Sequence, residues 1–190
     1  MLDELERRIL EAVRRHARDG LLPPASITVG LEPAEFAALC SGVQLPLGDA
    51  IEDMPPAESG GRPAMLLPLI ALLWSHRSGN APWTRLIAGT IASAAFGARH
   101  LWQDLGAAGR SEVTALMERH FRSLAERNVR NLKWKHHLFQ CLGAEVGLPD
   151  LRPPRCDGCQ EQPLCFPDGP VEVRFRRRHD GPAAQTESAA

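Results

Sequence analysis

Along most of this chain, apolar side chains recur every three or four residues, which is the spacing of one face of an α-helix. In the first such stretch Leu5, Ile9 and Val13 alternate with Glu and Arg, and Gly20 is a suitable residue to end a helix. Later stretches repeat the pattern and are separated by glycines, prolines and Asn128. We therefore expect five to six helices, over residues 3–19, 33–41, 64–77, 84–105, 111–128 and 129–146.

Several residues define the expected ends and faces of these helices. Gly106 is suited to close the helix over 84–105 in the left-handed conformation, and Ser111 is a good N-cap for the next helix. In the last helix we expect an apolar stripe of Val129, Leu132 and Phe139. Proline and glycine are frequent over residues 44–63, which favours a surface loop there.

Length and composition favour one domain of ordinary globular character. The chain has 190 residues and a net charge of −1, so it can bury a sizeable core, and we expect no nucleic-acid or membrane partner. The apolar run over 64–74 is too short to span a bilayer. Because the N-terminal residues contain no hydrophobic signal region, we expect a cytoplasmic protein with reduced thiols.

The predicted fold class is mainly α, with a less regular C-terminal part. We expect a single helical domain over residues 1–148, an irregular cysteine-rich metal-binding loop over 149–169 and a disordered, flexible tail over 170–190. The cysteine-rich stretch combines proline, glycine and cysteine and has little apolar surface to bury. A bound metal is therefore the expected source of its order.

Three of the five cysteines fall within the short segment RCDGCQEQPLCF, at Cys156, Cys159 and Cys165. The odd number and uneven spacing do not suit a disulfide framework. Thiolates at the spacing C-x2-C-x5-C point to a soft metal or an iron–sulfur cluster. Structural zinc is the main rival, although zinc normally takes four ligands from two paired spacings and no second pair is present. Incidental free thiols are the remaining alternative, and Cys40, among apolar neighbours, is expected in the core.

Further ligands for this site could come from the helix expected over 129–146. Cys141 shares a helical edge with Trp134 and Leu138, so it is either a core residue or a ligand that faces the cysteine loop. His136 falls near the apolar stripe and His137 on the polar face, and either could be a ligand or a structural or solvated residue.

The same predicted helix carries three cations, Arg130, Lys133 and Lys135, and no acid between residues 129 and 144. Such a basic face could attract an anion, offset the negative charge of thiolates and sulfides, dock an acidic protein, or simply be solvated. Asp104 lies at i+4 from His100, so it could orient a ligand histidine, although a surface pair is the commoner arrangement.

Three segments together resemble one known family. They are HLWQDLG at residues 100–106, SEVTALMERHFRSLAERN at 111–128, and LKWKHHLFQCLGAEVG at 132–147, which runs into the cysteine segment. This order of segments is similar to the NifQ family, the molybdenum-handling proteins of nitrogen fixation. The resemblance implies a non-enzymatic cytoplasmic carrier that takes up molybdate and holds molybdenum on a molybdenum–iron–sulfur cluster. Its implied partners are the nitrogenase iron protein and the scaffold on which the iron–molybdenum cofactor is assembled.

The chain departs from the family pattern at one position. The family signature is C-x4-C-x2-C-x5-C, and its first cysteine corresponds here to Leu151. The resemblance therefore implies cluster ligation by Cys156, Cys159 and Cys165, either alone or with Cys141 as a substitute ligand. The candidate ligands for molybdenum are histidines, namely His100, His120, His136 and His137.

A different class of protein is also compatible with these residues. A zinc-stabilised helical module could use the basic face to dock on a protein or a nucleic acid. An enzyme is less favoured, because the sequence contains no Ser/His/Asp or paired-carboxylate arrangement at telling spacing, no Walker A motif and no dinucleotide fingerprint.

Overall fold

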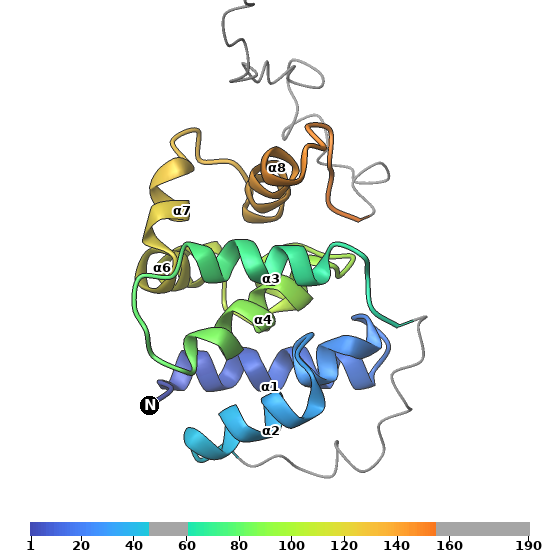
Figure 1. Ribbon diagram of the computed structural model, residues 1–190, viewed down its shortest axis with the longest axis vertical. Helices are drawn as coiled ribbons and strands as arrows, with labels where there is room; N and C mark the ends of the chain where they lie inside the picture. The colour runs from blue at the N-terminus through green and yellow to red at the C-terminus, as the bar shows by residue number, and fades with distance from the viewer. Residues whose placement is uncertain (46–60, 155–190) are drawn as a thin grey trace, which may run out of the picture.

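The computed structural model describes residues 1–45 and 61–154, and within these ranges the chain is helical and has no strand (Figure 1). The helices are α1 (Glu4–Arg18), the 3-10 helix η1 (Pro24–Thr28), α2 (Pro33–Gly42), α3 (Leu66–Ser75), α4 (Thr84–Ala95), α5 (Leu101–Asp104), α6 (Arg110–His120), α7 (Arg122–Arg127) and α8 (Trp134–Val146). The predicted mainly α class is confirmed. Most of the predicted loop over 44–63, and the predicted cysteine loop and tail from residue 155 onward, lie outside the described residues.

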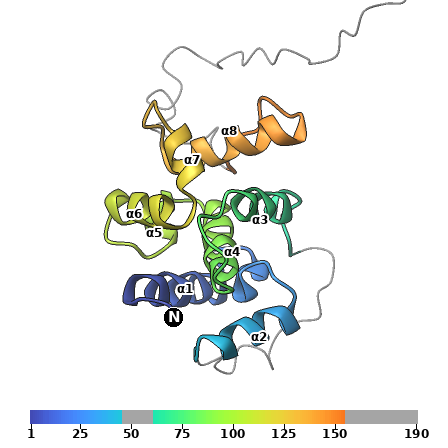
Figure 2. The same ribbon diagram turned by 60° about the vertical axis from the view of Figure 1, so that its left-hand side comes forward.

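Helix α4 forms the centre of the body, between α1 on one side and α3 on the other (Figures 1 and 2). Every residue of α4 except Arg85 is buried. Gly89 permits this close packing, because a Cβ at that position would overlap the carbonyl oxygen of Val29. The close neighbour at this position is the segment just after η1, which begins at Val29.

Two predicted helices are each broken into two, which raises the number of helices above the expected five to six. The stretch over 84–105 is interrupted after Ala95, and α5 starts only at Leu101, so that the chain turns and brings the Asp104 carboxylate back beside Gly97. The stretch over 111–128 is interrupted at Phe121, whose backbone leaves the helical region while its ring is completely buried. In both places tertiary packing decides against a continuous helix.

The predicted helix ends are partly confirmed. Gly20 and Gly106 have positive φ and follow α1 and α5, as expected, and Gly147 has positive φ directly after α8. The predicted N-cap at Ser111 is wrong, because α6 already begins at Arg110. The carboxylate of Glu112 instead accepts a hydrogen bond from the backbone N–H of Ala108.

The last helix begins later than predicted. Residues 129–133 form a loop, and Val129, which we expected in an apolar stripe, is 86% exposed. Cys40 is completely buried, as expected for a core cysteine. None of the helices among the described residues is long and apolar enough to cross a membrane.

Candidate metal centre

Cys156, Cys159 and Cys165 lie outside the described residues, so the structure describes the helix and the connecting segment that lead to them. Helix α8 ends at Gly147, whose positive φ reverses the chain direction. The backbone N–H of Leu148 then donates to the carbonyl of Gly143 at 2.8 Å, and the N–H of Leu151 donates to the carbonyl of Leu148 at 3.0 Å. We call residues 147–154 the return segment.

The return segment packs directly against the side of α8 on which Gly143 lies. A Cβ at Gly143 would overlap the carbonyl oxygen of Leu148 and would come within 3.0 Å of the Leu151 Cβ. Leu151 is half-buried against the core, and Pro153 is buried. The Leu151 side chain, at the position that the resemblance gives to the family's first cysteine, therefore makes an apolar contact with α8.

Cys141 faces a different direction and is engaged with His137. Its Sγ lies 3.7 Å from Nε2 and 3.9 Å from Nδ1 of His137, while Nε2 of His137 lies 2.9 Å from the carbonyl oxygen of Leu124. Because that carbonyl can only accept, Nε2 carries the proton and Nδ1 is left to accept from the thiol. Burial raises the pKa of the Cys141 thiol and lowers the pKa of His137. Both groups are thus held in their neutral forms, which does not favour a thiolate ligand.

The expectation that His137 lies on the polar face is wrong. His137 is buried between α8 and α7, and its ring contacts the Trp134 ring edge-on. The helical wheel that placed it outside assumed a helix from residue 129, whereas the helix begins at Trp134.

His136 lies on the side of α8 that carries the return segment. It is seven residues before Gly143, so the two share one helical face, and it lies about 140° around the helix from Cys141. Its ring is half-buried, and its pKa is lowered by burial and then by the positive charges of Arg130 and Arg152. The surroundings of His136, near the N-terminal end of α8, are therefore electropositive, as the run of cations in the sequence indicated.

Lys135 does not belong to that exposed basic face. Its ammonium group donates to the Asp104 carboxylate at 2.6 Å and to the backbone carbonyls of Gly97 and Arg99 at 2.9 and 2.5 Å. Asp104 is completely buried and also accepts from Arg99 Nε at 2.9 Å, so the predicted surface pair with His100 is wrong. His16 of α1 lies 2.9 Å from the Asp104 carbonyl oxygen. We call these contacts the Asp104 hub, and they tie α1, α5 and α8 together.

The other two candidate histidines lie elsewhere. His100 is half-buried at the start of α5, where its backbone N–H donates to the Gln103 side chain. His120 is buried and lies 2.7 Å from the Glu6 carboxylate, which also helps to cap α1. Within residues 1–45 and 61–154, no three His, Cys, Asp or Glu side chains come together as a metal site. The described residues alone therefore do not form a complete centre.

Sequence reasoning missed the Asp104 hub, although the chain carries a signal for it. Asp104 follows Leu101 by three residues and directly precedes Leu105, and both leucines are buried, so a helical face that holds the acid also enters the core. A lone buried acid requires a cation, and Lys135 and Arg99 supply it.

Comparison with known proteins shows the family of this chain, and the match extends beyond the described residues. The family model described as NifQ matches residues 7–167, which include the three clustered cysteines. The NifQ protein of Rhodobacter capsulatus is 33% identical over 150 residues, covering 76% of this chain and 79% of its own length. The NifQ protein of Klebsiella pneumoniae is 32% identical over 161 residues, covering 80% of this chain and 91% of its own.

A third relative covers less. The NifQ protein of Azotobacter vinelandii is 37% identical over 98 residues, which is 52% of this chain and 50% of that protein. No solved structure matches this chain. With a family model that covers most of the sequence and two relatives aligned over three quarters or more of it, the chain belongs to the NifQ family of proteins associated with nitrogen fixation.

Proposed function

We propose that this protein is a molybdenum carrier that holds molybdenum on an iron–sulfur cluster and donates it for assembly of the nitrogenase iron–molybdenum cofactor. The observation that carries the proposal is the C-x2-C-x5-C spacing of Cys156, Cys159 and Cys165 in a chain of the NifQ family. Three thiolates at this spacing can hold three irons, one sulfur ligand each. When bound, such a cluster would supply sulfide ligands that hold molybdenum in a soft environment.

The described residues fit this use of the cysteine segment. The return segment, which precedes the cysteines in the sequence, packs on the His136 side of α8, and Arg130 and Arg152 bring positive charge to that side. Positive charge there offsets the negative charge of thiolates and sulfides and favours the approach of the molybdate anion. Among the four candidate histidines, His136 is the one placed on the same helical face as the return segment, so we assign it to molybdenum.

Cys141 is a weaker candidate for a fourth thiolate. It faces His137 and Leu124, about 140° around α8 from His136, and its environment favours the protonated thiol. We therefore favour cluster ligation by the three loop cysteines. The partners in this proposal are the nitrogenase iron protein and the cofactor-assembly scaffold, and the compartment is the cytoplasm.

The test is anaerobic reconstitution with ferrous salt, sulfide and molybdate, followed by measurement of bound iron and molybdenum. Cys159→Ser should lose most of the iron, and Cys40→Ala, which changes only a core thiol, should keep it. His136→Ala should keep iron and lose molybdenum, whereas Cys141→Ser should keep both. Full iron retention by Cys159→Ser, or an unaltered protein that stays colourless and takes up neither iron nor molybdenum, would contradict the proposal.

A further inference from the structure

The loop between α7 and α8, residues 128–133, is fixed by its own side chains. The Asn128 amide donates to the carbonyl of Leu132 at 2.9 Å, and its oxygen accepts from the Leu132 N–H at 2.8 Å. The N–H of Asn131 donates to the carbonyl of Asn128 at 2.9 Å, and Asn131 adopts the left-handed conformation with φ of 52°. Asparagine tolerates this conformation better than most residues, so these hydrogen bonds hold the backbone of residues 128–132 in a single conformation.

Helix α6 holds the same loop from the other side. Arg110 donates through one nitrogen to the backbone and side-chain oxygens of Asn131, at 2.9 and 2.6 Å, and to the carbonyl of Leu132 at 2.8 Å. Just beyond the loop, the Trp134 indole N–H donates to the Thr114 hydroxyl of α6 at 3.0 Å. The loop therefore presents one rigid surface rather than a range of conformations.

This rigid loop directs an apolar side chain into solvent. Val129 is 86% exposed, and its neighbour Arg130 is also exposed. A single exposed apolar residue is common on protein surfaces. Here, however, the side chains of Asn128 and Arg110 together fix the backbone that holds it outward. Such preorganisation lowers the entropy cost of binding, which makes Val129 suited to anchor a partner.

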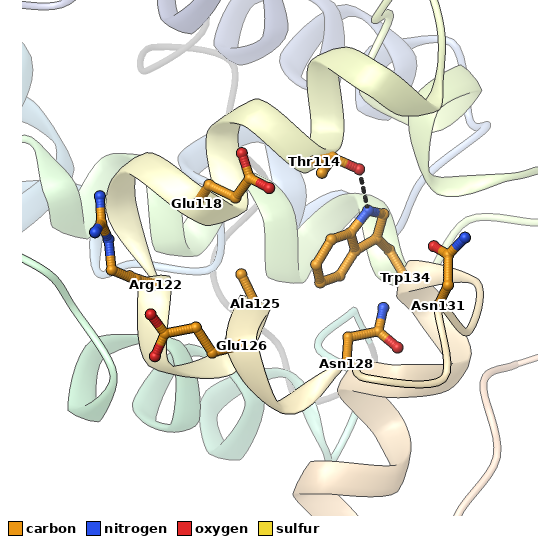
Figure 3. A pocket seen from close by; sticks show the side chains of 8 residues that line it. All are labelled: Thr114, Glu118, Arg122, Ala125, Glu126, Asn128, Asn131 and Trp134. Atoms are coloured by element: carbon orange, nitrogen blue, oxygen red, sulfur yellow. Dashed lines mark hydrogen bonds between the residues drawn. The ribbon is translucent and has the colours of Figure 1, made fainter.

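A cavity of about 500 Å3 lies beside the loop, between α6 and α7 (Figure 3). Its polar groups near the loop, the Thr114 hydroxyl and the Asn128 amide, already take part in internal hydrogen bonds. The charged groups on its rim are Glu118, Arg122 and Glu126. In the part of the chain that the structure describes, neither carboxylate forms an ion pair, and the net charge of these three side chains is negative.

We propose that the 128–133 loop and this cavity form one protein-docking surface. Its partner offers an apolar hollow to Val129, a carboxylate to Arg130 and a lysine or arginine side chain to the cavity between Glu118 and Glu126. A small molecule in the cavity would not cover Val129 and Arg130, which project outside it, so the occupant is a protein. The assignment rests on the proposed function only in the choice of the proteins used as probes.

The position of this surface suits a carrier that hands over its cargo. Helix α8 begins directly after the loop, and the charge of Arg130 acts on His136, two residues into that helix. A partner docked on the loop would therefore sit beside the electropositive end of α8. Helices α1 and α2 lie on the opposite side of the body, away from α7 and α8 (Figures 1 and 2).

The experiment measures anaerobic binding of the full chain to purified nitrogenase iron protein and, separately, to the cofactor-assembly scaffold. Val129→Asp should weaken the complex at least about tenfold, as expected for a central anchor, and the exposure of Val129 leaves folding unchanged. Glu126→Lys should weaken it by a similar factor through repulsion of the partner's cation. Asn128→Ala, which frees the loop and keeps Val129, Arg130 and both carboxylates, should weaken it about threefold to tenfold.

Leu21→Asp is the matched control, because Leu21 is 50% exposed and follows α1, the helix that lies away from α7 and α8 in Figure 1. It should bind like the unaltered protein. Equal binding by the unaltered protein, Val129→Asp and Glu126→Lys would overturn the docking surface and leave the proposed function intact. Absence of any complex with either probe would also overturn it, while iron and molybdenum uptake by the isolated chain tests the proposed function separately.

Discussion

Helices α4 and α8 are almost equal in length, at 12 and 13 residues, but they are held in place in different ways. Apolar contacts bury every residue of α4 except Arg85. Helix α8 buries one face, against α3 and α7, and is otherwise held by Lys135 in the Asp104 hub and by the return segment at Gly143. Apolar burial is therefore concentrated in α4. Helix α8, which carries the candidate ligand His136, lies at the periphery and is positioned by specific polar contacts.

The largest effect is expected from a cavity in the central helix. Ile91 is completely buried in α4, so Ile91→Ala should lower the free energy of unfolding by about 4 kcal/mol, within the range for large-to-small changes in cores. Urea denaturation measures this value. Leu67→Ala on α3, where the side chain is 47% exposed, is the control and should change it by less than about 0.5 kcal/mol. Equal losses in the two variants would contradict the central position of α4.

The next effect tests the Asp104 hub. Lys135→Met removes the ammonium that pairs with a completely buried carboxylate, so we expect a loss of roughly 3 kcal/mol. Hydrogen exchange should become faster in α8 than in α4, because Lys135 belongs to α8, whereas α4 is held by its own apolar contacts. Arg130→Met, at an exposed position in the preceding loop, should leave exchange in α8 unchanged. Uniformly faster exchange in both helices would show that the hub is part of the main core.

A smaller effect is expected where the return segment meets α8. A methyl group at Gly143 would overlap the Leu148 carbonyl, so Gly143→Ala should cost about 2 kcal/mol and displace the return segment. Iron uptake on reconstitution should fall, since the cysteines follow this segment. Gly42→Ala at the end of α2, where a Cβ meets nothing, is the matched control and should retain full uptake. Unchanged iron uptake in Gly143→Ala would show that the position of the return segment does not affect metal binding.

Acidification should weaken the folded state through the α8 histidines. Burial lowers the pKa of His137, so the unfolded chain binds a proton near pH 6.5 while the folded protein still resists protonation. The free energy of unfolding is unaffected by this group above about pH 6.5, and it declines as the pH falls below that value. In metal-free protein, His137→Gln should have a shallower decline over this window, and His136 should account for part of what is left. An identical decline would show that His137 is protonated freely.

The smallest effect concerns thiol reactivity. Because burial raises the pKa of Cys141, and also that of Cys40, both should react slowly with iodoacetamide at pH 8 in metal-free native protein. Peptide mass spectrometry distinguishes them from the clustered cysteines. In urea all five cysteines should react at similar rates. Rapid labelling of Cys141 in the native protein would show that it is available as a thiolate. Cys141 would then again be a candidate for the fourth cluster ligand.

Much of the fold could be predicted from helical periodicity, and the failures have physical causes. Helices α1, α2 and α3 lie close to their predicted positions because each carries a clear apolar pattern and suitable end signals. The breaks before α5 and at Phe121 could not be predicted, because they serve contacts between distant segments, such as Asp104 with Lys135. Local propensity cannot reveal such contacts.

For the candidate site, the sequence was informative about residue types and less informative about their directions. The spacing of the three clustered cysteines predicts a soft-metal or iron–sulfur site without any structure. Which histidine lies on the side of the return segment depends on the start of α8 and on the turn at Gly147, and both are set by tertiary contacts. For that reason His137 was expected outside and is buried, while Lys135 was expected in a basic face and belongs to the hub.

The most direct test of the central claim is elemental analysis of molybdenum, iron and zinc in protein produced and purified without oxygen. The account predicts a brown protein that contains iron and molybdenum and little zinc, and a Cys159→Ser variant that has lost both metals. A colourless protein that contains zinc, or one that contains none of the three metals, would contradict it.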